Sequence, residues 1–158
     1  MSKKRIAIGS DHRGFRLKHA IVSLLTELGH QYQDMGCYSS DSVDYPDVAE
    51  KVARAVANHE ADCGVLICGT GIGMSIVANK MPGVRAALCS DPFSARMARQ
   101  HNDANVLCMG GSTLGEWLAR EITTVYLSAE FEGGRHARRV EKISLLENGS
   151  RPRNTNDQ

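Results

Sequence analysis

The sequence predicts an α/β protein built on a doubly wound sheet of five parallel strands between two layers of helices. Two observations carry this prediction. Short apolar runs alternate along the chain with longer segments of helical period. Several of these runs, such as residues 64–67, are apolar on both faces, as strands are when helices cover a parallel sheet on two sides.

The first part of the chain contains two strand and helix pairs. Arg5 to Gly9 is a predicted strand, and the helix after it carries apolar residues on one face before a stop at Gly29. Gln31 to Met35 is a short second strand, and the next helix begins near Tyr45. The apolar positions of the two helices are Leu17, Ile21, Leu24, Leu25 and Leu28 in the first and Val48, Val52 and Val56 in the second.

Three more pairs and a last helix follow. The expected strands are residues 64–67, 84–88 and 105–109, and the expected helices are residues 72–80, 92–101, 114–127 and 136–146. This pattern makes residues 1–147 a single domain. Residues 148–158 form a polar tail without a large apolar side chain, which we expect to be disordered. The predicted strand order is 2-1-3-4-5, that of Rossmann-like sheets of the flavodoxin type, with the last helix as an addition.

The overall charge argues against polyanionic partners. The chain has 19 Lys and Arg residues and 18 Asp and Glu residues, a formal net charge of +1. Such a balance gives no broad field for nucleic acid or an anionic membrane, so we expect neither partner. The basic start, Met1 to Arg5, leads into an apolar run too short for a signal peptide or a membrane span. We therefore expect the protein in the cytoplasm.

Five cysteines stand at positions 37, 63, 68, 89 and 108. Their odd number and the lack of a C-x-x-C pair favour reduced thiols in a cytosol over a disulfide framework or a zinc cage. No metal site is therefore predicted. Because buried cysteine is a common core residue, a function for any one of them needs further support.

Two unusual loops follow strands that should be neighbours in the sheet. Residues 9–14, GSDHRG, come after the first strand, and residues 68–73, CGTGIG, come after the third. Ligands of doubly wound sheets bind beyond the carboxyl ends of the strands, where the strand order reverses. For the order 2-1-3-4-5 that place lies between strands one and three, so the two loops should face one ligand.

The segment VLICGTGIGMS places Cys68 before three alternating glycines at a helix start. It lacks the complete pattern of a dinucleotide site or of a nucleoside triphosphate loop. What remains is a row of backbone N–H groups that favours negative charge and hence a thiolate, so Cys68 is a candidate base or nucleophile. A tyrosine phosphatase would need arginine at position 74, where this chain has Met74, and a receiver domain would need aspartate at position 68, where it has Cys68. The sequence therefore excludes both of these classes.

Three other groups have both an ordinary and a functional interpretation. Asp11 is a helix cap or, with His12, a ligand for sugar hydroxyls or phosphate. His101, beside Asn102, interacts with a helix end or acts as a general acid. Arg135 and Arg139, four residues apart, form a solvated basic face or a phosphate site.

Five separated motifs resemble type B ribose-5-phosphate isomerases, in matching order from residue 5 to about residue 147. They are G-S-D-H-x-G at 9–14, C-G-T-G-I-G at 68–73, Asn79-Lys80, H-N-D-A-N-V-L at 101–107 and G-G-R-H-x-x-R-V at 133–140. The resemblance implies an aldose-ketose isomerisation through a cis-enediolate, without metal or other cofactor. Related isomerases act on galactose 6-phosphate or allose 6-phosphate, and another phosphorylated aldose, including a four-carbon one, is the alternative substrate. A non-catalytic flavodoxin-like binding module is the more distant alternative.

The resemblance also implies a role for each candidate residue. Cys68 is the base that moves the proton between C2 and C1, His101 opens the sugar ring, and Asp11 assists at the sugar oxygens. The oxyanion is held by the backbone N–H groups of the glycine loop with the Thr70 side chain. The loop residues are Gly69, Thr70, Gly71, Ile72 and Gly73; the phosphate candidates are His12, Arg135 and Arg139; and Asn102 is a hydroxyl or enediolate partner.

Two departures from the family pattern concern the same site. Some members lack the cysteine and use a glutamate at the place of Met74, and because Met74 cannot take a proton, Cys68 is left as the base. Ser112 stands where many members carry an arginine associated with the phosphate. Family members are homodimers, or dimers of dimers, in which the neighbouring subunit completes the active site, and the resemblance implies the same here.

Overall fold

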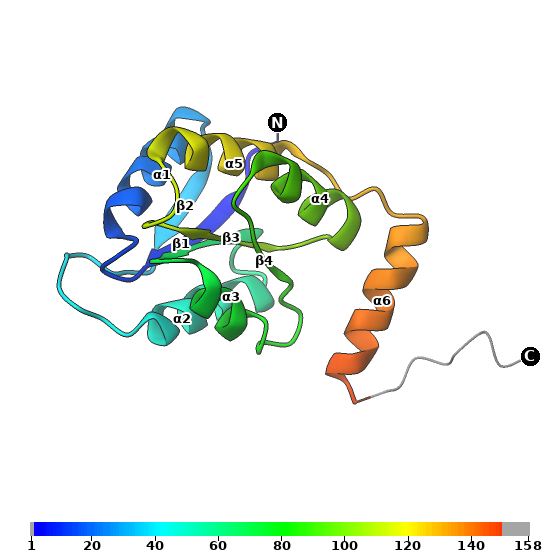
Figure 1. The fold of residues 1–158 in the computed structure, drawn as a ribbon. Coiled ribbons are helices and arrows are strands. Elements are labelled where there is room, and N and C mark those ends of the chain that lie inside the picture. Colours follow the sequence, from blue (N-terminus) through cyan, green and yellow to red (C-terminus); the bar gives the residue numbers. More distant parts are fainter. Residues whose placement is uncertain (1, 150–158) are drawn as a thin grey trace, which may run out of the picture.

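The computed structural model describes residues 2–149, in which five parallel strands form one sheet between helices (Figure 1). The strands are β1 (Arg5–Ser10), β2 (Gln31–Asp34), β3 (Cys63–Cys68), β4 (Ala86–Leu88) and β5 (Val106–Gly110). The helices are α1 (Phe15–Glu27), α2 (Tyr45–Ala57), α3 (Ile72–Ala78), α4 (Pro92–Asn102), α5 (Glu116–Ser128) and α6 (Arg135–Glu147). The predicted fold class is confirmed.

The predicted order of the last two strands is wrong. The sheet runs β2-β1-β3-β5-β4, so β5 pairs with β3 and β4 lies at the edge. Every residue of β5 is buried, whereas none of the residues of β4 is. A strand that is apolar on both faces belongs inside a covered parallel sheet, and the longer Val106–Gly110 run fits that place better than Ala86–Leu88. The loop after β5 therefore lies beside the loop after β3.

The helices form two layers around the sheet. α1, α4 and α5 pack on one face through a core that includes Ile8, Ile67 and Leu107. α2 and α3 cover the other face, where Val52 and Leu66 are buried. Because side chains alternate along a strand, Cys68 points to the same side as Leu66, toward α2 and α3.

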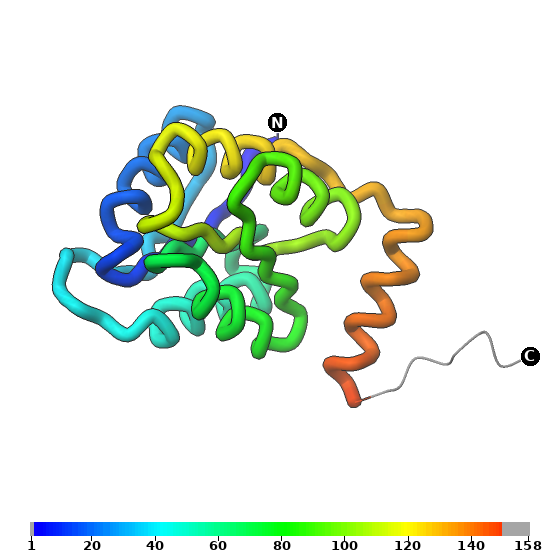
Figure 2. Tube along the Cα trace, in the orientation of Figure 1, coloured from blue at the N-terminus to red at the C-terminus, as the bar shows by residue number. Residues whose placement is uncertain are grey.

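The last helix does not belong to either layer. In Figures 1 and 2, α6 stands away from the body beside α4, joined by an extended connection after α5. No helix among residues 2–149 has the length and apolarity needed to cross a membrane. The predicted polar tail begins after α6, and its residues 150–158 lie outside the described residues.

A buried ion pair fixes the loop after β2 against the first helix. Lys18 on α1 is 1% exposed, and its Nζ donates to both carboxylate oxygens of Asp34 at 2.7 and 2.8 Å and to the carbonyl oxygen of Cys37. The sequence analysis did not single out this lysine. Its contacts hold the chain around Cys37 next to the carboxyl end of β1, where the candidate site begins.

Candidate active site

A cleft of about 860 Å³ opens at the carboxyl ends of β1 and β3. Two predicted loops and the start of α2 form its walls. Its lining residues are Asp11, His12, Arg13, Ser42, Val43, Asp44, Tyr45, Pro46, Cys68, Gly69, Thr70, Ile72, Gly73 and Ile76. Seven predicted site residues, from Asp11 to Gly73, thus meet in one cleft although the two loops are distant in the sequence.

Asp11 holds the turn that leads to Gly14, the N-cap residue of α1. Its Oδ1 accepts hydrogen bonds from the backbone N–H groups of Arg13 at 2.9 Å and Gly14 at 3.0 Å. These bonds satisfy the turn that leads into α1, as a capping residue would. The other carboxylate oxygen, Oδ2, makes no hydrogen bond within residues 2–149, so it is left for a ligand in the cleft.

His12 is held from the opposite wall. Its Nδ1 accepts a hydrogen bond from the backbone N–H of Val43 at 3.3 Å, in the loop before α2. A neutral imidazole that accepts at Nδ1 carries its proton on Nε2. His12 therefore has a donor available to an anionic ligand.

Cys68 ends β3 at the base of the cleft. Its Sγ accepts a hydrogen bond from the backbone N–H of Gly71 at 3.1 Å, which holds the thiol against the glycine loop. The turn requires glycine at position 71, where φ is +78° and a Cβ would lie 2.8 Å from the carbonyl carbon of Met109. Gly71 is buried and shapes the loop without lining the cleft.

The glycine loop also presents backbone donors. The N–H groups of Gly69 and Thr70 make no hydrogen bond within the described part of the chain. Thr70 Oγ1 accepts from the N–H of Ile72 at 3.3 Å, which fixes the exposed threonine at the start of α3. Amides held in this way can stabilise a developing oxyanion without reorganisation.

The other cysteines differ from Cys68 in their surroundings. All five thiols are free and buried, but Cys68 alone is among the residues that line this cleft. Burial raises the pKa of Cys63 to about 12 and that of Cys89 to about 11, and it raises the pKa of Cys108 as well. These three remain protonated near neutral pH.

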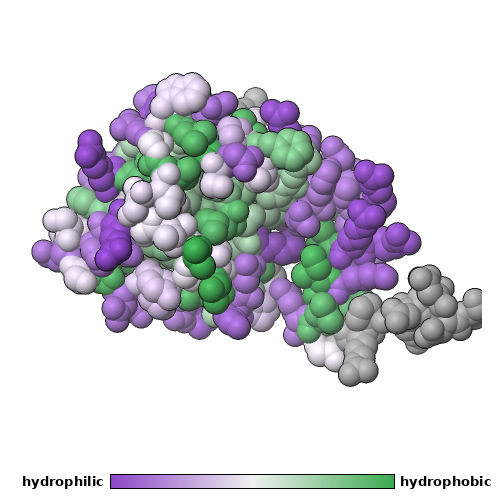
Figure 3. All heavy atoms as spheres, in the orientation of Figure 1, coloured by the Kyte–Doolittle hydropathy of each residue, from purple (hydrophilic) through white to green (hydrophobic). Residues whose placement is uncertain are grey.

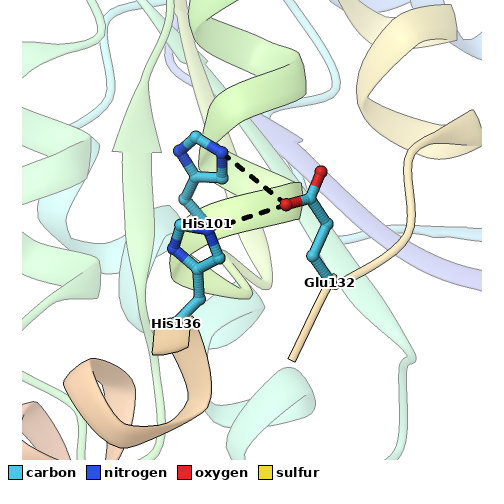
Figure 4. A group of neighbouring side chains, drawn as sticks. All are labelled: His101, Glu132 and His136. Carbon is cyan, nitrogen blue, oxygen red and sulfur yellow. Dashed lines mark ion pairs between the residues drawn. The ribbon is translucent and has the colours of Figure 1, made fainter. Parts of the chain in front are cut away.

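A second group of side chains, which includes the predicted site residue His101, lies where α4 meets α6 (Figure 4). The rings of His101 and His136 are stacked, with centroids 4.1 Å apart and planes 6° apart. Glu132 Oε2 lies 3.9 Å from Nε2 of His101 and 3.6 Å from Nε2 of His136. Burial, with the nearby charges of His101 and Arg135, lowers the pKa of His136, while Glu132 acts in the opposite direction.

Histidine and glutamate ligand atoms in this second group are close enough to hold a metal ion. Those of His101, Glu132 and His136 all lie within 4.8 Å of one another. The sequence analysis predicted no metal site. The Glu132 carboxylate lies within reach of both stacked imidazoles, and we assign no metal to this group.

Within one chain, the two groups lie toward opposite ends of the strands of the sheet. Cys68 is at the carboxyl end of β3, whereas α4 runs back antiparallel to the strands and brings His101 and Asn102 to the edge where β5 begins. Arg135 begins α6, and Arg139 lies one turn further along it, both exposed. None of these four residues lines the cleft of its own chain.

Sequence reasoning missed two neighbours of the glycine loop. Arg13 stands between His12 and Gly14, so its position inside a singled-out motif was an available signal. Tyr45 lies over Gly73, where a Cβ would come within 2.6 Å of the phenol ring. No local pattern in the sequence indicates that contact, because it joins segments 28 residues apart in the chain.

Comparison with known proteins gives consistent matches over nearly the whole chain. The Ribose/Galactose Isomerase family profile matches residues 6–143. Ribose-5-phosphate isomerase B of Escherichia coli K12 is 54% identical over 144 residues, covering 91% of this chain and 97% of that protein. D-erythrulose-4-phosphate isomerase of Pectobacterium atrosepticum is 46% identical over 146 residues, covering 90% and 94%.

A solved structure agrees with these matches. Ribose-5-phosphate isomerase B of Clostridium thermocellum superimposes with a TM-score of 0.91 at 51% sequence identity, covering 92% of this chain and 98% of that one. The family profile, the similar sequences and the similar structure all identify the same family of sugar-phosphate isomerases. The chain belongs to the ribose/galactose isomerase family.

Proposed function

We propose that the chain is a ribose-5-phosphate isomerase, which interconverts D-ribose 5-phosphate and D-ribulose 5-phosphate through a cis-enediolate. The observation that carries the proposal is the Cys68 thiol, hydrogen-bonded by the Gly71 N–H and lining one cleft with Asp11 and His12. An isomerase needs a base beside a carbon acid and donors for the oxygen that becomes negative. The cleft contains both.

Cys68 moves the carbon-bound proton. As a thiolate it removes the proton from C2 of the open-chain aldose, and the electron pair shifts to give an enediolate with negative charge on the oxygen of C1. The C2 hydroxyl passes its proton to the C1 oxygen, and the thiol then returns its proton to C1 as the C2 oxygen becomes the ketone. The N–H groups of Gly69 and Thr70 stabilise the charged oxygen, and Oδ2 of Asp11 binds a sugar hydroxyl.

His101 opens the sugar ring by giving a proton to the ring oxygen, while the C1 hydroxyl releases its proton to water and becomes the aldehyde. Asn102 binds a hydroxyl of the substrate, and Arg135 and Arg139 bind the phosphate with His12. None of the residues His101, Asn102, Arg135 and Arg139 lines the cleft of its own chain, so a second copy of the chain has to bring them to it. We therefore propose a homodimer, alone or within a dimer of dimers, with shared active sites.

Exposed apolar side chains support this assembly. Ile72 and Ile76, on the rim of the cleft, are 51% and 55% exposed, and Phe93 at the start of α4 is 70% exposed. Figure 3 shows apolar atoms gathered on this face of the body, and also on the side of α6 that faces the body, opposite its hydrophilic outer side. Isolated chains rarely leave so much apolar surface in water around a functional cleft.

Subunit complementation tests the shared site. A heterodimer of one Cys68→Ala chain and one His101→Ala chain, isolated through two different tags, should recover about half of the wild-type kcat, because one of its two sites contains both intact residues. Each homodimeric variant alone should be nearly inactive. A heterodimer as inactive as the two homodimers would show that Cys68 and His101 do not act across the interface.

The four-carbon relative gives a second candidate function. A protein named D-erythrulose-4-phosphate isomerase is 46% identical to this chain. We expect kcat/KM to be highest for ribose 5-phosphate when five-carbon, four-carbon and six-carbon sugar phosphates are compared. A higher value for D-erythrulose 4-phosphate, or for allose or galactose 6-phosphate, would transfer the assignment to that substrate. The assay is run with EDTA, so that activity in it tests the metal-free reaction.

We also propose that the enzyme is located in the cytoplasm, where its free thiols stay reduced.

A further inference from the structure

We propose that Arg13 is a phosphate-binding residue of this cleft and determines the affinity for phosphorylated over unphosphorylated sugar. The inference rests on the proposed function, since it assigns one more residue to the same substrate. It concerns a side chain from the end of β1 that lies within the cleft of a single chain, separate from the arginines of α6.

The charges around the cleft call for a cation. Among its lining residues, Asp11 and Asp44 are acidic, and Arg13 is the one side chain that is permanently positive. Without Arg13, the cleft of one chain would present two carboxylates and no permanent positive charge to a phosphate dianion. A guanidinium matches phosphate oxygens with two parallel N–H donors, so it offsets the repulsion and orients the ligand.

The backbone of Arg13 is fixed while its charged end is free. Its N–H donates to Oδ1 of Asp11 at 2.9 Å, and its carbonyl oxygen packs against Gly111, where a Cβ would lie 2.7 Å from it. The guanidinium takes part in no hydrogen bond or ion pair within residues 2–149. The fixed backbone leaves only the side chain to be ordered on binding, and the exposed guanidinium is available to a ligand.

The aliphatic part of the Arg13 side chain lies next to Gly69, the residue after Cys68. A Cβ on Gly69 would lie 3.1 Å from Cδ of Arg13 and 3.7 Å from Oγ of Ser112. Ser112 is tied to the same residue, since its N–H donates to the carbonyl oxygen of Gly69 at 2.9 Å. The side chains of Arg13 and Ser112 therefore start on two sides of one space. The short serine leaves this space to the arginine, and an arginine at position 112 would reach into it from the other side.

Replacing Arg13 with methionine should raise the KM for ribose 5-phosphate about tenfold or more, with a smaller change in kcat, because the phosphate takes no part in the proton transfer. Arg13→Lys should keep part of the affinity. Arg16→Met is the matched control: Arg16 is also exposed and lies at the start of α1, but it does not line the cleft, and its KM should not change. An unchanged KM in Arg13→Met would overturn the proposal.

The double variant Arg13→Met with Ser112→Arg tests the shared space. It should return KM to within about threefold of the wild type, because the second guanidinium reaches the same phosphate. A double variant with the KM of Arg13→Met would show that position 112 cannot replace position 13, which contradicts the geometry.

A binding experiment separates this proposal from the proposed function. In the Cys68→Ala background, which binds without turnover, calorimetry with ribose 5-phosphate and with inorganic phosphate should show weaker binding of both after Arg13→Met. If the wild-type protein does not isomerise ribose 5-phosphate but phosphate binding still depends on Arg13, the proposed reaction is refuted and the phosphate site stands. Equal binding with and without Arg13 would refute the site alone.

Discussion

Replacing Cys68 with alanine is expected to lower kcat for ribose 5-phosphate by at least about a hundredfold, the usual scale for a positioned proton-transfer group. KM should change little, because the thiol contacts the carbon-bound proton and the phosphate and hydroxyl contacts remain. Met74, on the helix after the glycine loop, is 0% exposed and has no proton-accepting group, so it does not take over as the base. Steady-state kinetics with ribose 5-phosphate measure both constants.

Cys63→Ala is the control for this variant. Cys63 begins β3 and Cys68 ends it, and the two are 6% and 5% exposed, so each substitution removes a sulfur of similar burial from the same strand. Cys63→Ala should lose some stability and keep kcat. Near-normal turnover in Cys68→Ala, or an equal loss in both variants, would rule out Cys68 as the base.

Gly14→Ala should both destabilise the protein, by roughly 3 kcal/mol in the free energy of unfolding, and reduce kcat/KM. A Cβ on Gly14 would lie 2.3 Å from the carbonyl oxygen of Ile67 and 2.6 Å from its carbonyl carbon. Backbone atoms of a central strand cannot move aside as a flexible side chain does. The loop after β1 has to shift, which breaks the 3.1 Å hydrogen bond from Asp11 N–H to the same oxygen and displaces Asp11 from Cys68, the next residue after Ile67.

Gly115→Ala gives the comparison. Gly14 and Gly115 both precede a helix, α1 and α5, and both have ordinary negative φ values of −91° and −73°. A Cβ on Gly115 meets no atom within 4 Å. Urea unfolding of the two variants should show a large loss of stability for Gly14→Ala alone. Similar stability in both would mean that the close approach of Gly14 to β3 relaxes without cost.

Much of the fold could be predicted because burial acts locally. The all-apolar residues 64–67 and the spacing of Val48, Val52 and Val56 reflect faces that must be covered, and the sheet and helices follow from them. The order of β4 and β5 could not be predicted in the same way. Both segments read as apolar strands, and only packing of the whole sheet exposes Ala86–Leu88 at the edge.

The site was predictable where its residues stand at the ends of strands. Asp11 and Cys68 follow β1 and β3, and the topology of the sheet alone brings them together. Tyr45 over Gly73, and the stem of Arg13 beside Ser112, depend on side-chain packing between loops and leave no periodic signal. The position of His101 toward the amino ends of the strands follows from the antiparallel course of α4, whereas a site shared between subunits was indicated only by the family resemblance.

The placement of the two half-sites has a consequence for symmetry. In the proposed dimer, each chain contributes a donor half, the residues at the junction of α4 and α6, and an acceptor half, its own cleft, and the two halves lie toward opposite ends of the strands. A two-fold pair, in which each donor half meets the other chain's acceptor half, closes on itself and leaves neither half exposed. A head-to-tail arrangement would continue into a filament with one unused half at each end. A closed pair is thus the smallest assembly in which the Cys68 of every chain would be used, and specific activity should fall when the pairs dissociate on dilution.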